Sequence, residues 1–177
     1  IPFFPASVWL FALPYAVSPD PLVATWFVST VSVVTVAGVW WLGRRWNTTA
    51  GLIAALFMAA SPYAVFYGRS IWQPNLLAPL ALAWAGAVTV AATRDSRAGR
   101  LATALAVFLG LLVFQVHFAG LALIPATSYF FLRFGWWRRL IAVLAGGALA
   151  LLAVLPYVYY VTLVAPEVLA RYGEVIG

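Results

Sequence analysis

The sequence contains no cysteine and no lysine, and it has one histidine and four carboxylates in 177 residues. Without cysteine there is no disulfide framework, no thiolate metal site and no cysteine nucleophile. One His and four acidic residues leave little for a metal site, which usually needs three or four protein ligands. A phosphate-binding glycine loop, a Walker lysine and the HExxH and GxSxG motifs are also absent. We therefore expect no bound metal, no cofactor and no nucleotide hydrolysis.

Apolar and aromatic residues make up most of the chain instead. Hydrophobic residues account for 66% of the sequence and charged residues for 8%, whereas soluble domains have about 45–50% apolar and about 25% charged residues. Many of the aromatic residues lie beside polar breaks, where interfacial belts form. The composition predicts an integral membrane protein. The net charge of +6 comes from arginines in short loops between apolar segments, so we expect it to orient the chain and predict no nucleic-acid partner.

Several apolar runs are long enough to cross a bilayer, which takes about 20 mostly apolar residues. The run 101–132 carries no charge, but it is too long for one upright helix at about 1.5 Å per residue. We interpret it as two short helices broken near Gln115 to Gly120. The predicted membrane segments are 22–42, 50–67, 75–93, the two halves of 101–132, and 140–163.

The arginines indicate how these segments are oriented. If 101–132 runs out and back, eight arginines fall on one side, and only Arg69 and Arg171 lie opposite, as the positive-inside rule predicts. The sequence thus predicts an all-α, polytopic transmembrane bundle of about six segments, multi-pass in the plasma (inner) membrane. Its extracytoplasmic face would carry residues 18–21, residues 67–75, residues 115–120 and the C-terminal tail. The eight arginines of the other side are Arg44, Arg45, Arg94, Arg97, Arg100, Arg133, Arg138 and Arg139.

The two ends of the chain differ from its apolar middle. Residues 1–17 are too short to span easily and contain three prolines, so we predict an interfacial or partly inserted helix. Residues 22–163 hold the membrane segments, and residues 164–177 read as the start of an outer loop. We treat 1–177 as one domain. Because the chain begins at Ile1 without an initiator Met or a signal peptide, we expect an internal fragment of a larger protein.

Small residues recur every fourth position in two of the segments. Such stripes let helix backbones approach closely in lipid, so we expect them to form packing faces without a chemical role. They are Ala83, Ala87 and Ala91 in one segment, and Ala102, Ala106 and Gly110 in the next.

The stretch "YGRSIWQPN", Tyr67 to Asn75, is a polar interruption between two apolar membrane segments. Pro74 occupies a plausible first helical position, so the N-terminus of the next helix would point outward. Its free N–H groups and the guanidinium of Arg69 together suit an anion such as a lipid phosphate. Alternatively, Arg69 neutralises the carbonyls that end the preceding helix and extends to the headgroups.

Four neighbours of Arg69 could complete a sugar site. Gln73 and Asn75 could hydrogen-bond sugar hydroxyls, and Trp72 and Tyr67 could stack on a sugar ring or an isoprenoid chain. The alternative is that Trp72 is only a belt residue. The two amides beside the arginine favour the functional interpretation.

Three further polar residues are expected near the same face. Gln115 and His117 lie at the predicted helix break, where they could contact the acceptor or the lipid phosphate, or be hydrogen-bonded structural residues. Asp20, flanked by two prolines, is typical of a turn and helix start, and a role as catalytic base is the weaker alternative.

The order of these motifs resembles the C-class membrane glycosyltransferases of the dolichyl-phosphate-mannose protein mannosyltransferase type, which include the bacterial lipid A aminoarabinose transferases. The resemblance covers residues 1 to 163, and it depends on the order and spacing of "LGRRW", "SPYAVFYGRSIWQPNLLAPL", "FLGLLVFQVHFAGLALIP" and "LPYVYY".

This resemblance implies an enzyme of the cell envelope that takes a sugar from a polyprenyl-phosphate carrier. It would transfer the sugar to a lipid, glycan or protein acceptor on the extracytoplasmic face. In the family, a carboxylate in the first outer loop activates the acceptor hydroxyl. Residues 1–17 resemble the short interfacial helix after that loop, so the catalytic carboxylate is expected upstream of Ile1. The fragment would then contain no catalytic residue and would be inactive alone.

Two other classes of protein fit the sequence less well. A secondary transporter or permease also has polytopic helices with a broken pair, but it should place its polar residues near the midplane of the membrane. In this chain the polar residues collect toward one predicted surface. A non-catalytic membrane scaffold would use the stretch from Tyr67 to Asn75 only as a loop.

Overall fold

The computed structural model describes residues 5–164, and every element in this range is helical, with no strand. The prediction of an all-α chain is therefore confirmed, while the predicted outer loop lies almost wholly outside the described residues. In chain order the elements are α1 (Pro5–Val17), α2 (Pro21–Gly43), α3 (Thr48–Ala60), α4 (Pro62–Tyr67), η1 (Gln73–Leu76), α5 (Leu77–Thr93), α6 (Arg97–Val116), η2 (Phe118–Ala122), α7 (Leu123–Arg133), η3 (Trp136–Arg139), α8 (Leu140–Tyr159) and η4 (Tyr160–Val164).

Within the described residues, four helical stretches are long and apolar enough to cross a membrane. Shorter apolar helices accompany them, so the chain forms a polytopic helical bundle, as predicted. The long stretches are Pro21–Gly43, Gln73–Thr93, Arg97–Val116 and Trp136–Val164, and the shorter ones are Pro5–Val17, Thr48–Ala60 and Phe118–Arg133.

The predicted break within residues 101–132 is present at His117. This residue ends α6 with an extended backbone (φ −160°, ψ 146°), and η2 begins immediately after it. Its own side chain caps the new turn, because the Ala119 N–H donates to His117 Nδ1 at 3.1 Å. The first of the two helices is longer than expected, because Ser96 caps it and it starts at Arg97.

The predicted segment 50–67 is interrupted as well, which the sequence analysis did not anticipate. Helix α3 ends at Ala60, and α4 starts at Pro62. Proline has no backbone N–H and restricts the residue before it to extended conformations, and Ser61 is extended (φ −62°, ψ 117°). The Ser61 hydroxyl accepts a hydrogen bond from the Ala64 N–H at 3.4 Å, which caps α4.

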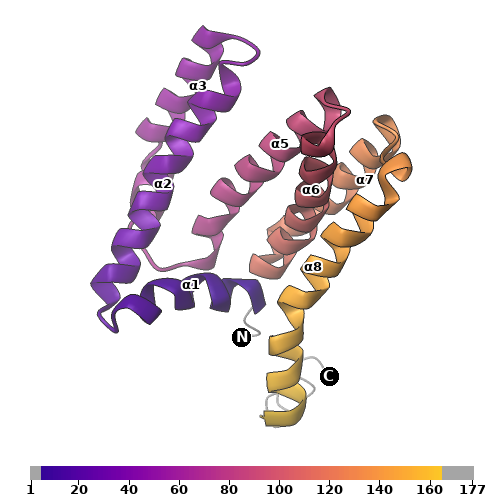
Figure 1. Cartoon of the computed structure of the whole chain (residues 1–177). Helices are drawn as coiled ribbons and strands as arrows, with labels where there is room; N and C mark the ends of the chain where they lie inside the picture. The colour runs from indigo at the N-terminus through magenta and orange to yellow at the C-terminus, as the bar shows by residue number, and fades with distance from the viewer. Residues whose placement is uncertain (1–4, 165–177) are drawn as a thin grey trace, which may run out of the picture.

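The bundle has two chemically different ends (Figure 1). The loops α2–α3, α5–α6 and α7–α8 lie at the upper end in Figure 1, with eight arginines in and beside them, and we name it the arginine-rich end. The α4–α5 connection and the α6–α7 break lie at the other end, which we name the Arg69 end. Helix α1 lies there across the axes of the other helices and packs against α2, α6 and α8. This arrangement is the one expected of an interfacial helix.

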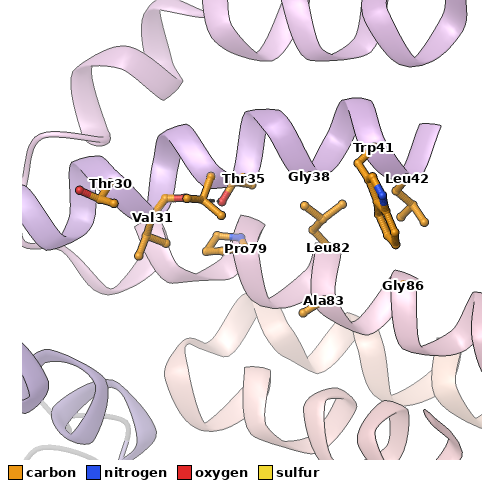
Figure 2. A pocket seen from close by; sticks show the side chains of 11 residues that line it. Thr30, Val31, Thr35, Gly38, Trp41, Leu42, Pro79, Leu82, Ala83 and Gly86 are labelled. Atoms are coloured by element: carbon orange, nitrogen blue, oxygen red, sulfur yellow. Dashed lines mark hydrogen bonds between the residues drawn. The ribbon is translucent and has the colours of Figure 1, made fainter. Parts of the chain in front are cut away.

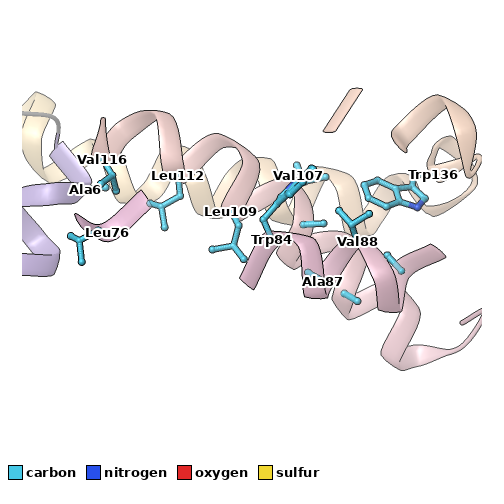
Figure 3. Close-up of a cluster of buried hydrophobic side chains, with 13 residues drawn as sticks. Ala6, Leu76, Trp84, Ala87, Val88, Val107, Leu109, Leu112, Val116 and Trp136 are labelled. Atoms are coloured by element: carbon cyan, nitrogen blue, oxygen red, sulfur yellow. The ribbon is translucent and has the colours of Figure 1, made fainter. Parts of the chain in front are cut away.

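The tightest part of the core is the contact between α5 and α6 (Figure 3). Most of the small residues predicted to pack are buried, namely Ala87, Ala91, Ala102, Ala106 and Gly110. The prediction is wrong for Ala83, which is exposed. Helix α8 joins this pair through Gly146, where an added Cβ would lie 2.3 Å from the Ala104 carbonyl oxygen. The small side chains thus set how closely α5, α6 and α8 approach.

Arg139 joins three elements at the arginine-rich end. Its side chain is only 15% exposed, and its guanidinium donates to carbonyl and side-chain oxygens of the α5–α6 region. These acceptors are Ala91 O (2.8 Å), Thr103 Oγ1 (3.1 Å), Arg94 O (3.1 Å), Gly99 O (3.4 Å) and Asp95 Oδ1 (3.4 Å). Arg139 therefore satisfies carbonyls that α5 leaves free at its C-terminus.

Candidate functional site

The loop between α4 and α5 is folded around the side chain of Asn75. Its amide Nδ2 donates to the carbonyl of Tyr67, to the carbonyl of Ser70 at 2.7 Å and to Ser70 Oγ at 3.4 Å. The Ser70 hydroxyl in turn donates to Tyr67 O at 3.0 Å. Because the Asn75 NH₂ group is committed to the loop, only its carbonyl oxygen is left to face a ligand.

Helix α2 holds this loop from the side. Ser29 Oγ donates to the carbonyl of Gly68 at 3.2 Å, and Gly68 is buried. A Cβ added at Gly68 would lie 2.7 Å from Ala64 O and 3.1 Å from Ser32 Oγ. This close packing requires glycine at position 68. It also fixes the position of the backbone at Arg69, the next residue. Ser29 was missed by sequence reasoning, and its hydroxyl within an apolar span was the signal that could have revealed it.

Arg69 is exposed in the loop, and aromatic residues on both sides of it in the sequence form a row of rings in tilted or edge-on contact. The ring centroids of Tyr63 and Tyr67 are 4.4 Å apart, and those of Tyr67 and Trp72 are 4.7 Å apart. Phe66 meets Tyr67 edge-on at 5.1 Å. An exposed cation beside such a row suits an amphiphile with an anionic head and an apolar body, because the two parts find matching surfaces.

The first turn after the loop is a 3-10 helix that starts at Gln73, with Pro74 in its first turn. Trp72 precedes it with an extended backbone and makes no side-chain capping bond. The prediction placed Pro74 at the first helical position, and the structure starts the helix one residue earlier. Gln73 is half-buried, and Trp72 before it is exposed.

Gln115 lies between α6 and α8. Its Nε2 donates to the Ala150 carbonyl at 2.9 Å, and its Oε1 is buried and has no hydrogen-bond partner within the described part of the chain. A buried carbonyl oxygen without a donor is costly, most of all in a low-dielectric environment. A hydroxyl from a ligand would satisfy it.

His117 has a structural role that the sequence left open. The imidazole Nδ1 accepts the Ala119 N–H, and the backbone carbonyl of His117 accepts the Gly120 N–H at 2.8 Å. With Nδ1 as the acceptor, the neutral ring carries its hydrogen on Nε2. The His117 ring therefore caps the turn that follows the helix break, and its second nitrogen, Nε2, carries a hydrogen that can donate.

The loop and the helix break lie at the same end of the bundle. Leu76 at the end of η1, Val116 at the end of α6 and Ala6 of α1 are all buried in one cluster, and Figure 3 shows the three close together. The structure thus brings 67–76 and 115–117 to one end. Arg69 and Trp72 are exposed and Tyr67 is half-buried, whereas Gln115 lies deeper between helices.

The one carboxylate described at the Arg69 end acts as a helix cap. Asp20 precedes α2, and its Oδ1 accepts the Leu22 N–H at 2.9 Å. This confirms the predicted helix start, with Pro21 as the first residue of α2. Within residues 5–164, no group of three or more His, Cys, Asp or Glu side chains could hold a metal ion.

Comparison with known proteins gives one match over most of the chain. A family model described as dolichyl-phosphate-mannose-protein mannosyltransferase matches residues 2–160. No curated protein and no solved structure matches the chain.

Proposed function

Because the chain belongs to the dolichyl-phosphate-mannose-protein mannosyltransferase family, we propose that it is part of an enzyme that uses a polyprenyl-phosphate sugar. The sugar would pass to a lipid, glycan or protein acceptor on the extracytoplasmic face of the membrane. The observation that carries this proposal is the position of Arg69. Among the described residues it is the one arginine at the Arg69 end, and it lies beside the aromatic row.

The distribution of arginines supports the orientation that the proposal needs. Eight of the nine described arginines lie at one end of the bundle. Loops rich in Lys and Arg stay in the cytoplasm, so the Arg69 end would face outward. The phosphate of a lipid carrier in the outer leaflet would then lie at the same depth in the membrane as Arg69.

The chemistry assigns Arg69 to the leaving group. The acceptor hydroxyl oxygen forms a bond to the anomeric carbon, while the bond between that carbon and the phosphate oxygen breaks. The bonding pair goes to the phosphate, whose added negative charge the guanidinium stabilises. The hydroxyl proton passes to a base, and none of the residues proposed for this site is a carboxylate.

The other residues of the site are assigned to the sugar and the acceptor. Tyr67 and Trp72 offer ring faces for the sugar or the isoprenoid chain, and Gln73 is the amide beside them. Deeper in the bundle, Gln115 Oε1 accepts a hydroxyl, and His117 lies two residues on at the helix break as a further sugar or acceptor contact. Asn75 mainly shapes the loop, because its NH₂ group already bonds Tyr67 and Ser70.

Reconstitution of the full-length protein in liposomes tests the proposal. A polyprenyl-phosphate sugar with a radiolabelled sugar is supplied together with candidate lipid, glycan and protein acceptors. The enzyme should release polyprenyl phosphate as it labels an acceptor. A transporter would instead move the intact donor across the bilayer, and a scaffold would leave it unbound and unchanged.

A further inference from the structure

A groove of about 440 Å³ lies between α2 and α5 and runs from Thr30 and Pro79 toward Trp41 and Gly86 (Figure 2). This volume falls within the range of about 300–1,000 Å³ that is usual for ligand pockets. Its walls are mostly apolar. They include Val34, Gly38, Trp41, Leu82 and Gly86.

Two glycines, Gly38 and Gly86, shape this groove because they have no side chain. At Gly38 the helices are in close contact, since an added Cβ would lie 2.5 Å from Leu82 Cδ2. At Gly86 an added Cβ would meet nothing within 4 Å. Val34 at the groove is 63% exposed. The groove is therefore open on its lipid-facing side, and Gly86 keeps it wide toward the arginine-rich end.

A positive charge stands at the mouth of the groove. Trp41 lines it, and the guanidinium carbon of Arg45 lies 4.1 Å from the centroid of the Trp41 ring. Arg44 makes the same kind of contact with Trp40, at 4.6 Å. Both arginines are exposed beyond the C-terminus of α2. Of the two rings only Trp41 lines the groove, so the apolar groove ends beside the guanidinium of Arg45.

We propose that this groove binds one acyl chain of an anionic phospholipid whose phosphate lies at Arg45. The chain's methylenes match the apolar walls, and the planar guanidinium matches phosphate oxygens. The Thr35 hydroxyl on the wall is already bonded to Val31 O at 2.7 Å. The charge at the mouth favours an anionic headgroup. We assign the groove to a phospholipid and not to the polyprenyl carrier because the proposed function places the carrier's phosphate at Arg69, at the opposite end of the bundle.

Native mass spectrometry and lipid analysis of the full-length protein, purified in a mild detergent, test this proposal. The wild type should retain a phospholipid with an anionic headgroup. Gly86→Leu places a side chain in the groove and should lower the lipid-bound fraction about tenfold. Gly147→Leu is the matched control, because Gly147 lies on α8 and an added Cβ there also meets nothing within 4 Å. It should leave the bound fraction unchanged.

The headgroup is tested with a second pair of variants. Arg45→Gln should remove the preference for anionic over zwitterionic phospholipids, while Arg138→Gln, at the same end but in the α7–α8 loop, should keep it. If Gly86→Leu does not fold, Val34→Phe narrows the groove from its open side and should lower the bound fraction in the same way.

Three results would overturn the proposal. One is a wild-type protein that retains no phospholipid, as expected if another segment of the complete protein covers the groove. Another is retention of a polyprenyl phosphate in place of a phospholipid, with loss on Gly86→Leu. The third is equal retention of phospholipid by a folded Gly86→Leu or Val34→Phe variant and the wild type.

Discussion

Arg138 and Arg139 are neighbours in the sequence and have different surroundings in the structure. Arg138 is exposed, whereas the Arg139 guanidinium is enclosed by the α5–α6 turn and hydrogen-bonds Ala91 O and Thr103 Oγ1. The sequence predicted one role for both, that of orienting the chain. Only the path of the α7–α8 loop turns one side chain inward, and the spacing of arginines contains no information about that path.

Arg139→Ala should destabilise the bundle by about 3 kcal/mol, because it leaves the part-buried carbonyls of Ala91 and Gly99 and the Thr103 hydroxyl without a charged donor. The corresponding fall in apparent melting temperature, measured in detergent, is about 5–10 °C. Arg138→Ala should change the melting temperature by less than about 1 °C, since exposed side chains contribute little. Equal melting temperatures for the two variants would show that the Arg139 hydrogen bonds do not stabilise the protein.

Gln115→Leu separates stability from activity. It removes the donor to Ala150 O together with the buried, unpartnered Oε1, and replacing an unsatisfied polar group by an apolar one costs little. The melting temperature should stay the same or rise. Sugar transfer by the full-length protein should fall about tenfold if Oε1 accepts a ligand hydroxyl. Unchanged transfer at an unchanged melting temperature would place Gln115 outside the site.

At the scale of the helix, neighbouring glycines of α8 have different functions. Gly146 faces α6, where an added Cβ would lie 2.3 Å from Ala104 O and 3.0 Å from Val107 Cβ. Gly147, one residue on, faces open space. Close packing of α8 on α6 therefore requires Gly146 and places no demand on Gly147.

Gly146→Ala should destabilise the protein by about 1–3 kcal/mol, because the added methyl forces α8 away from backbone that cannot move easily. Gly147→Ala should stabilise it by up to about 1 kcal/mol, because alanine favours the helix. Thermal unfolding of the two variants under the same conditions measures both effects. A loss of stability from Gly147→Ala, or none from Gly146→Ala, would contradict the packing described here.

The helices show which features of this fold the sequence could reveal. Apolar length predicted the spans, and the run 101–132 predicted a break, because too many residues were available for one crossing. The break at Ser61 and Pro62 was missed, since segment 50–67 has the right length for one helix and a proline can also kink one. The close contact at Gly146 depends on how α6 and α8 pack together. The residue pattern of one helix does not reveal which neighbour it packs against.

The candidate site, like the helices, was only partly predictable from the sequence. The resemblance of the motifs predicted the family correctly, and the loop stretch indicated Arg69 and its aromatic neighbours. The bond from Ser29 to Gly68 and the internal use of Asn75 could not be predicted. The Ser29 bond depends on how α2 packs against the loop, a contact between residues 39 positions apart in the chain. The Asn75 bonds depend on the path of the loop backbone itself.

At the scale of the whole molecule, the arginine-rich end and the Arg69 end give the bundle a direction across the membrane. The proposed function needs the Arg69 end outside, and the proposed phospholipid site lies at the other end. The cysteine-free sequence allows this orientation to be tested one position at a time.

Single cysteines at Ile71 and Trp46, both exposed, should react from opposite sides of the membrane. In intact cells, a membrane-impermeant maleimide should label Ile71→Cys. It should label Trp46→Cys only after the membrane is permeabilised, because arginine-rich loops stay in the cytoplasm. A cysteine-free form of the full-length protein is the control. The reverse labelling pattern would show that the Arg69 end faces the cytoplasm.

Binding of the donor to an Arg69 variant is the most direct test of the whole account. The affinity of the full-length protein for a polyprenyl-phosphate sugar is measured in liposomes for the wild type, Arg69→Ala, Arg69→Lys and Arg138→Ala. Arg69→Ala should weaken binding about tenfold to a hundredfold, as loss of a charge-assisted bond predicts. Arg69→Lys should retain part of the affinity, and Arg138→Ala all of it. Wild-type affinity and wild-type transfer in Arg69→Ala would contradict the assignment of the donor phosphate to this loop.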